Sequence, residues 1–181
     1  MITAIIAAGL YPDSDDQDGD QWITRVCFTN QLFTALATVM TMSESWDLKS
    51  WRLGAPILPN VQLDSFVSVL PILLRAGLRP EPGFHMAMLY GFPSVEHFIL
   101  CMSAFRTAGA VLESRRKNVK VLHDVLRSIG KGELKAGWDP DVVVQSFIDV
   151  GVEVDKGALK IATRFDLFTC AQRISQCLAA M

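Results

Sequence analysis

The chain has 181 residues, of which 50 % are hydrophobic and 20 % charged, against about 25 % charged in an average globular protein. This composition excludes an intrinsically disordered chain, and the formal net charge of −2 excludes an overall basic field that would attract nucleic acid or an anionic membrane. The length suffices for one domain with a full hydrophobic core.

Acidic side chains gather near the N-terminus, after an apolar helix or arm that we expect at residues 2–10. Residues 13–20 read DSDDQDGD and predict an acidic loop. An EF-hand with Gly19 at its sixth place would need a bidentate glutamate at the twelfth, where this chain has the cation Arg25. An EF-hand is therefore excluded. A solvated loop, a docking loop for a basic partner and a looser cation site stay open.

The next segment, residues 22–42, has the period of a long helix and is the most membrane-like stretch of the chain. It contains Arg25, Asn30 and Gln31, which a spanning helix would have to bury in hydrocarbon. We therefore expect no membrane span. The apolar start of the chain has no basic residues before it, so we also expect no secretory signal and a cytoplasmic protein.

A tryptophan-rich segment follows, in which a short helix over residues 43–53 leads into a loop with two prolines. Trp46, Trp51 and Leu53 are the apolar anchors we expect in a contact surface, with Arg52 beside them. Aromatic side chains with arginine are typical of the centre of an interface.

The middle of the chain has a helical period. A helix over residues 60–77 is expected to kink or break at Pro71, and a turn or two is expected at residues 85–90. Residues 94–114 predict a longer helix, because apolar side chains fall on one stripe from Val95 to Phe105. No alternating strand pairs and no internal repeat are apparent.

Residues 106–135 form a basic segment, with eight basic and three acidic side chains. If residues 115–129 are helical, Arg116, Lys120, His123 and Arg127 fall within an arc of about 60° beside the apolar stripe that would face the core. The candidate binding residues are Arg115, Arg116, Lys120, His123 and Arg127. They could follow a phosphate backbone, receive an acidic protein segment, or face solvent, and the lack of interleaved aromatics weakens the nucleic-acid hypothesis.

The C-terminal part begins with the glycine-rich residues 130–137, the candidate hinge. Asp139-Pro140-Asp141 then predicts a helix start with a capping carboxylate and proline in the first turn. Residues 142–150 are valine-rich, so a strand stays an alternative there. We expect Asp155 to cap a single last helix that runs to Leu178.

Catalytic and metal-binding motifs are missing from the sequence. It contains no GxSxG, GxGxxG or HExxH motif and no complete phosphate-binding loop. His97 and Cys101 have a metal-ligand spacing without a second pair. The four cysteines form no CxxC pair, which favours free thiols in a reducing compartment. We expect no enzyme, metal, cofactor or small-molecule substrate.

These observations predict a compact, bundle-like all-α domain of six to eight helices. Residues 1–181 form one helical domain, with a candidate division into a main body (1–129) and a C-terminal helical pair (138–181). The leading functional hypothesis is a non-enzymatic interaction or assembly protein that buries an apolar surface against itself or a protein partner. The alternative is a nucleic-acid-binding protein that uses the basic helix face around residues 115–127.

Overall fold

The computed structural model describes residues 52–53, 63–75, 77–115 and 118–181, and the fold of this part is all-α, as predicted. Two short strands, β1 (Arg52–Leu53) and β2 (Arg79–Pro80), pair in parallel. The described part of the chain contains seven helices: α4 (Leu63–Arg75), α5 (Phe84–Gly91), α6 (Val95–Ala108), α7 (Val121–Gly130), α8 (Pro140–Asp149), α9 (Lys156–Arg164) and α10 (Phe168–Ala179). The helices and loop expected within residues 1–51 lie outside the described residues. The helix expected over residues 43–53 is wrong at its end, where Arg52–Leu53 form β1.

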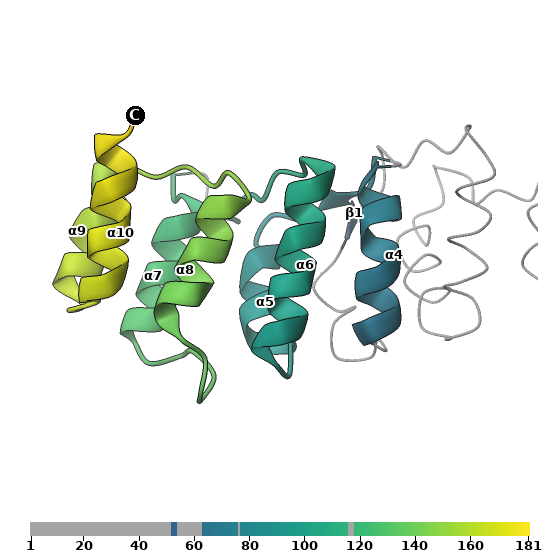
Figure 1. The fold of residues 1–181 in the computed structure, drawn as a ribbon, viewed down its shortest axis with the longest axis horizontal. Helices are drawn as coiled ribbons and strands as arrows, with labels where there is room; N and C mark the ends of the chain where they lie inside the picture. The colour runs from purple at the N-terminus through teal and green to yellow at the C-terminus, as the bar shows by residue number, and fades with distance from the viewer. Residues whose placement is uncertain (1–51, 54–62, 76, 116–117) are drawn as a thin grey trace, which may run out of the picture.

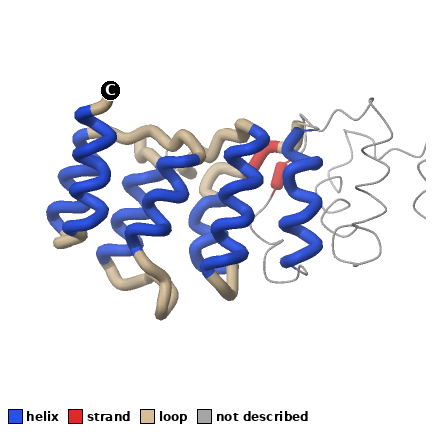
Figure 2. The backbone as a smooth tube through the Cα atoms, viewed as in Figure 1, coloured by secondary structure: helices blue, strands red, loops and turns tan. Residues whose placement is uncertain are grey.

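The helices form two layers and succeed one another as pairs (Figures 1 and 2). One layer holds α4, α6, α8 and α10, each in contact with the next, and the other holds α5, α7 and α9. The connections within the pairs α5/α6, α7/α8 and α9/α10 lie at one end of the stack, and the loops that lead from one pair to the next lie at the other end. This is the arrangement typical of helical solenoids.

The repetition of the pairs lies in their burial pattern. In α5 the buried positions are Phe84, His85, Met88 and Leu89, and in α7 they include Val121, Leu122, Val125 and Leu126, followed by Ser128 and Ile129. Both helices thus bury two adjacent residues and the two that follow one turn later. Because the residue types differ, the structural repeat does not appear as a repeat in the sequence.

Aromatic side chains carry the contact between neighbouring pairs. The Phe98 ring of α6 lies 5.4 Å from that of Trp138 and 5.7 Å from that of Phe147 on α8, measured between ring centroids. All three side chains are buried. Within the α5/α6 pair, the ring centroids of Phe84 and Phe105 lie 6.1 Å apart. Stacking of pairs therefore builds one continuous core.

Local signals set most helix ends. Asp139 caps α8 by accepting a hydrogen bond from the Asp141 amide at 2.8 Å, so the predicted start is confirmed and the strand alternative is wrong. The Ser94 side chain caps α6, which ends before Gly109 (φ 62°), short of the expected residue 114. Pro71 lies inside α4.

The single last helix expected after Asp155 is wrong, because the chain turns back at residues 165–167 and forms two helices. Asp155 caps α9, and Asp166 adopts a positive φ of 56° at the turn. Ala158 and Ala162 of α9 and Cys170 and Ile174 of α10 are buried. α9 packs on α7 while α10 packs on α8, which one straight helix could not do.

The connection at residues 130–137, the candidate hinge, joins α7 to α8. Glu133 accepts a hydrogen bond from Ser128, and Lys135 donates one to the carbonyl of Phe92. The division of the chain on either side of it stays a prediction. Among the described residues no helix is long and apolar enough to cross a membrane.

At Gly130, the last residue of α7, the Phe165 ring of the last pair lies close to the backbone. A Cβ at this position would lie 2.2 Å from Cγ of Phe165. We expect Gly130→Ala to lower the free energy of unfolding by about 1–3 kcal/mol through overpacking, although alanine is the better helix former. Urea denaturation measures the change.

The control for Gly130→Ala is the same substitution in a Phe165→Ala background. There the clash is gone, and helix propensity makes the change neutral or stabilising. An equal loss in both backgrounds would show that the ring contact is not the cause.

Candidate functional site

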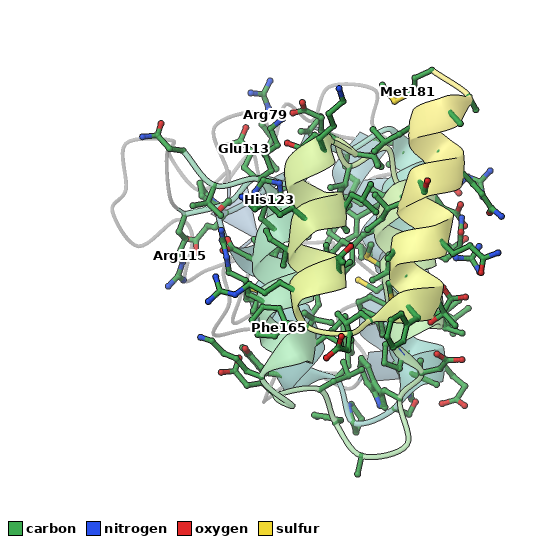
Figure 3. All side chains as sticks on the ribbon, turned by 90° about the vertical axis from the view of Figure 1, so that its left-hand side faces the viewer. Arg79, Glu113, Arg115, His123, Phe165 and Met181 are labelled. Carbon is green, nitrogen blue, oxygen red and sulfur yellow. The ribbon has the colours of Figure 1, made fainter. Side chains whose placement is uncertain are left out.

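Two loops between successive helix pairs enclose a groove. They comprise the described residues 109–115 and 118–120 of one loop and residues 150–155 of the other, at the end of the stack where the pairs connect. Glu113 and Arg115 lie on the side of α9, away from α10 (Figure 3). The groove, here called the loop groove, has a volume of about 740 Å³. Its lining comprises Pro82, residues 109–115, residues 119–121 and residues 150–153.

The loop groove is largely apolar, and a hydrogen bond ties one of its loops to the helix stack. Leu112 is buried in the core, while the neighbouring Val111 is 71 % exposed. The carbonyl of Glu113 accepts a hydrogen bond from the Gly83 amide at 2.7 Å, which ties the loop to the start of α5. Val111 is therefore held outward by a well-anchored backbone, in a position to contact a partner.

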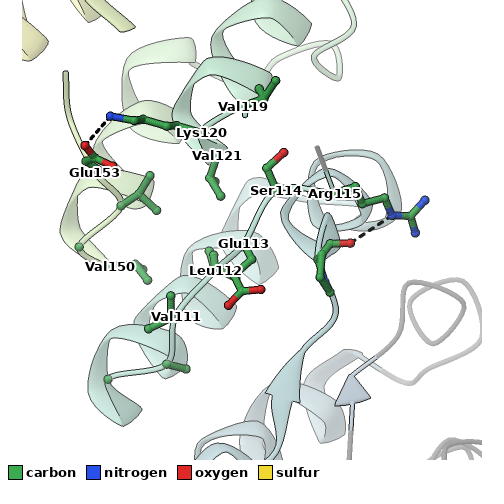
Figure 4. Close-up of a pocket in the computed structure, with 15 residues that line it drawn as sticks. Val111, Leu112, Glu113, Ser114, Arg115, Val119, Lys120, Val121, Val150 and Glu153 are labelled. Atoms are coloured by element: carbon green, nitrogen blue, oxygen red, sulfur yellow. Dashed lines mark hydrogen bonds and ion pairs between the residues drawn. The ribbon is translucent and has the colours of Figure 1, made fainter. Parts of the chain in front are cut away.

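Lys120 and Glu153 line the loop groove and pair with each other (Figure 4). Together with His123 and Asp155 they form a set of ion pairs, here called the ionic clamp. The ammonium of Lys120 pairs with Glu153 and lies 2.8 Å from Asp155, which also lies 2.8 Å from Nε2 of His123. Partial burial raises the pKa of Asp155, but hydrogen bonds from His123, Lys120 and the Ala158 amide outweigh it and hold that pKa well below its usual range. The clamp thus links two loops and caps α9.

A second hollow, here called the α5/α7 pocket, lies beside the loop groove and has a volume of about 480 Å³. Arg115 lines both hollows. Gly83, with φ 87°, permits this, because a Cβ there would lie 2.5 Å from Cγ of Arg115. The pocket is lined by Gly83, His85, Met86, Ala87, Tyr90, Arg115, Asp124, Arg127, Ser128, Lys131 and Glu133.

One rim of the α5/α7 pocket is a hydrogen-bonded triad. The hydroxyl of Tyr90 lies 2.6 Å from that of Ser128, and both donate to Glu133 at 2.8 Å. Burial is the main cause that raises the pKa of Tyr90, while the bonds from Ser128 and Tyr90 lower the pKa of Glu133. These hydrogen bonds therefore favour the charged form of the Glu133 carboxylate.

His85 forms part of the floor of the α5/α7 pocket. Its side chain is buried, and neither ring nitrogen has a hydrogen-bond partner among the described residues, although Nε2 lies 3.8 Å from Asp124. Desolvation lowers the pKa of His85 to about 4, against smaller opposing effects of Asp124 and of the Glu113 carbonyl, which lies near the ring without meeting hydrogen-bond geometry. Burying an unsatisfied polar group costs about 1–3 kcal/mol. The fold therefore carries a cost at this position.

The structure separates the basic residues that the sequence placed on one helix. α7 begins at Val121, so Arg115 lies in the preceding loop and Lys120 occupies the N-cap position. His123 and Arg127 lie one turn apart on α7, and Arg116 lies outside the described residues. Lys120 and His123 contact acidic side chains of the clamp. Phosphate binding by this set stays a prediction.

The predicted contact surface around Trp46 cannot be placed. Trp46 and Trp51 lie outside the described residues, as do the side chains of Arg52 and Leu53. The backbone of Arg52 and Leu53 forms β1, paired with Arg79 and Pro80 of β2. A binding role for these four residues stays a prediction.

The cysteines and the remaining histidine contact separate partners. Cys101, Cys170 and Cys177 are free, and the buried thiol of Cys101 lies 3.5 Å from the sulfur of Met88. Nδ1 of His97 lies 2.8 Å from the hydroxyl of Ser94. Within the described ranges no group of three or more His, Cys, Asp or Glu side chains could hold a metal ion.

Comparisons with protein-family models, with curated proteins and with solved structures found no match. We therefore infer function from the geometry of the two hollows. Sequence inspection missed His85, Tyr90, Ser128 and Glu133, which come from α5, α7 and the turn after α7. The sequence signal for His85 was that it occupies a position where the helical period predicts an apolar side chain. It becomes visible only when the buried positions of α5 are compared with those of α7.

The burial of His85 predicts a pH-dependent stability. The unfolded chain binds a proton at His85 near pH 6.5 and the folded protein near pH 4, so the unfolded state binds more protons between these values. We expect the free energy of unfolding to fall by roughly 3 kcal/mol as the pH drops from 7 to 4. Urea denaturation over this range measures it.

The matched variant is His85→Leu, which places at this position the residue that α7 has at Leu122. It removes the titrating group, so the decline between pH 6.5 and 4.5 should flatten. If the variant keeps the full slope of the wild type, His85 is not the group that titrates.

The clamp predicts different effects for two substitutions of Asp155. Asp155→Ala removes the acceptor of the Ala158 amide and the partner of Lys120, and should lower the free energy of unfolding by about 1–2 kcal/mol. Asp155→Asn keeps a capping oxygen and should cost less. Thermal and urea unfolding, with the exposed Asp149→Ala as control, measure the order, and equal losses for both variants would contradict a capping role.

Proposed function

We propose that this chain is a non-enzymatic protein-interaction module that binds an extended segment of a partner along the loop groove. The supporting observation is the groove itself, an apolar hollow between anchored loops with Val111 71 % exposed at its wall. Exposed apolar surface in a hollow with fixed walls favours association, because binding removes it from water without ordering the loops.

The partner segment that suits this groove is extended and partly apolar. The hollow runs along loop residues rather than along a helix face, and valines from both loops line it. A second copy of this chain is the other occupant the hypothesis allows. Binding to itself would make the protein an assembly subunit, and the test below separates the two.

A nucleic-acid function has no specific support from the geometry. Lys120 and His123, two of the candidate phosphate ligands, already contact Glu153 and Asp155. Phosphates would have to displace these carboxylates, which are themselves held in the clamp. The interaction hypothesis needs no such exchange.

Selection from a phage-displayed library of random dodecapeptides tests the proposal. We expect enrichment of peptides with apolar residues, and a loss of affinity of at least about tenfold for Val111→Asp. Val142→Asp is the matched control, since Val142 is 37 % exposed on α8, away from the groove. Fluorescence anisotropy measures the affinities.

Light scattering over a concentration series distinguishes partner binding from self-assembly. A mass that rises with concentration in the wild type but not in Val111→Asp indicates that a second copy occupies the groove. A monomer at every concentration, combined with no enriched peptide, would overturn the proposed function.

A further inference from the structure

In the α5/α7 pocket the acidic side chains are hydrogen-bonded within the protein, whereas the basic side chains have fewer partners. Its lining includes three cations, Arg115, Arg127 and Lys131, and two carboxylates, Asp124 and Glu133. The carboxylates are the groups already engaged within the protein. Asp124 accepts a hydrogen bond from Ser114 at 2.6 Å, and Glu133 accepts from both hydroxyls of the rim triad.

The cations are less engaged. Arg115 donates from Nε to the carbonyl of Pro82 at 3.1 Å, a contact that uses none of its terminal nitrogens. In the described part of the chain neither Arg115 nor Lys131 takes part in an ion pair. Arg127 lies 3.7 Å from Asp124 and is 38 % exposed. The pocket thus presents positive charge to a ligand.

The floor of the pocket is polar where the stack requires apolar packing. His85 occupies the position that Leu122 fills in α7, and both its ring nitrogens lack partners among the described residues. Natural proteins tolerate such unsatisfied groups chiefly where they serve a ligand or a function. This observation is independent of the charges at the rim, and it indicates the same hollow.

We propose that the α5/α7 pocket receives the carboxylate side chains of an acidic partner segment whose apolar residues occupy the loop groove. This inference rests on the proposed function and names the chemistry of the partner. Arg115 lines both hollows, so one extended chain can pass from the apolar groove to the pocket. Guanidinium groups bind carboxylates through paired N–H donors, which gives both affinity and orientation.

Paired synthetic peptides test the chemistry. The acidic probe is a fluorescein-labelled nonapeptide in which two valines precede three glutamates, with glycine and serine as spacers. The neutral probe has glutamine in place of each glutamate. We expect the acidic probe to bind at least about tenfold more tightly at low salt, and the difference to shrink as salt rises.

Variants of the two least engaged cations locate the contact. Arg115→Gln and Lys131→Gln should each weaken the acidic probe about five- to tenfold and leave the neutral probe unchanged. The matched controls are Arg106→Gln and Lys160→Gln, which remove exposed cations from α6 and α9 outside both hollows. All four side chains are exposed, and thermal unfolding checks that each variant folds.

The outcomes separate this inference from the proposed function. If both probes bind equally and both lose affinity in Val111→Asp, the groove binds peptides but the pocket does not select carboxylates, and this inference is overturned alone. If neither probe binds, and library selection enriches no peptide, both proposals fail. An oligouridylate that displaces the acidic probe at lower concentration than the unlabelled acidic peptide would identify a phosphate site and overturn the inference.

Discussion

The structure depends on one constraint, which is that a pair of short helices cannot bury its apolar face alone. Each pair here hides that face against the next one, as the Phe98 ring does between Trp138 and Phe147. Where the last pair meets α7, the contact is close enough that only glycine fits beside the Phe165 ring. Stability is therefore a property of neighbouring pairs, and the helix ends must align for the contacts to form.

The same stacking creates the surfaces to which we assign function. Successive pairs deliver their connecting loops to one end of the stack, so residues far apart in sequence, such as Val111 and Val152, line one groove. The clamp around Asp155 then fixes the loops relative to each other and to the start of α9. A rigid groove costs little entropy when a partner binds.

His85 is where packing and proposed function conflict. A leucine at this position, as in α7, would suit the core, yet the chain buries an imidazole without a hydrogen-bond partner among the described residues, beneath a rim that carries three cations. Departures from local packing rules are expected where a site requires them. The pocket and the loop groove share Arg115, so charge selection and apolar contact can act on one ligand.

The sequence by itself determined the all-α class and the caps at Asp139 and Asp155, because each cap depends on side chains within a few residues of one backbone segment. It also identified Arg115 and Arg127 as candidate binding residues, but not their surroundings. Only the tertiary structure decided the turn at Asp166, the burial of His85 and the convergence of Tyr90, Ser128 and Glu133. These depend on contacts between segments distant in the chain, which helical periodicity does not encode.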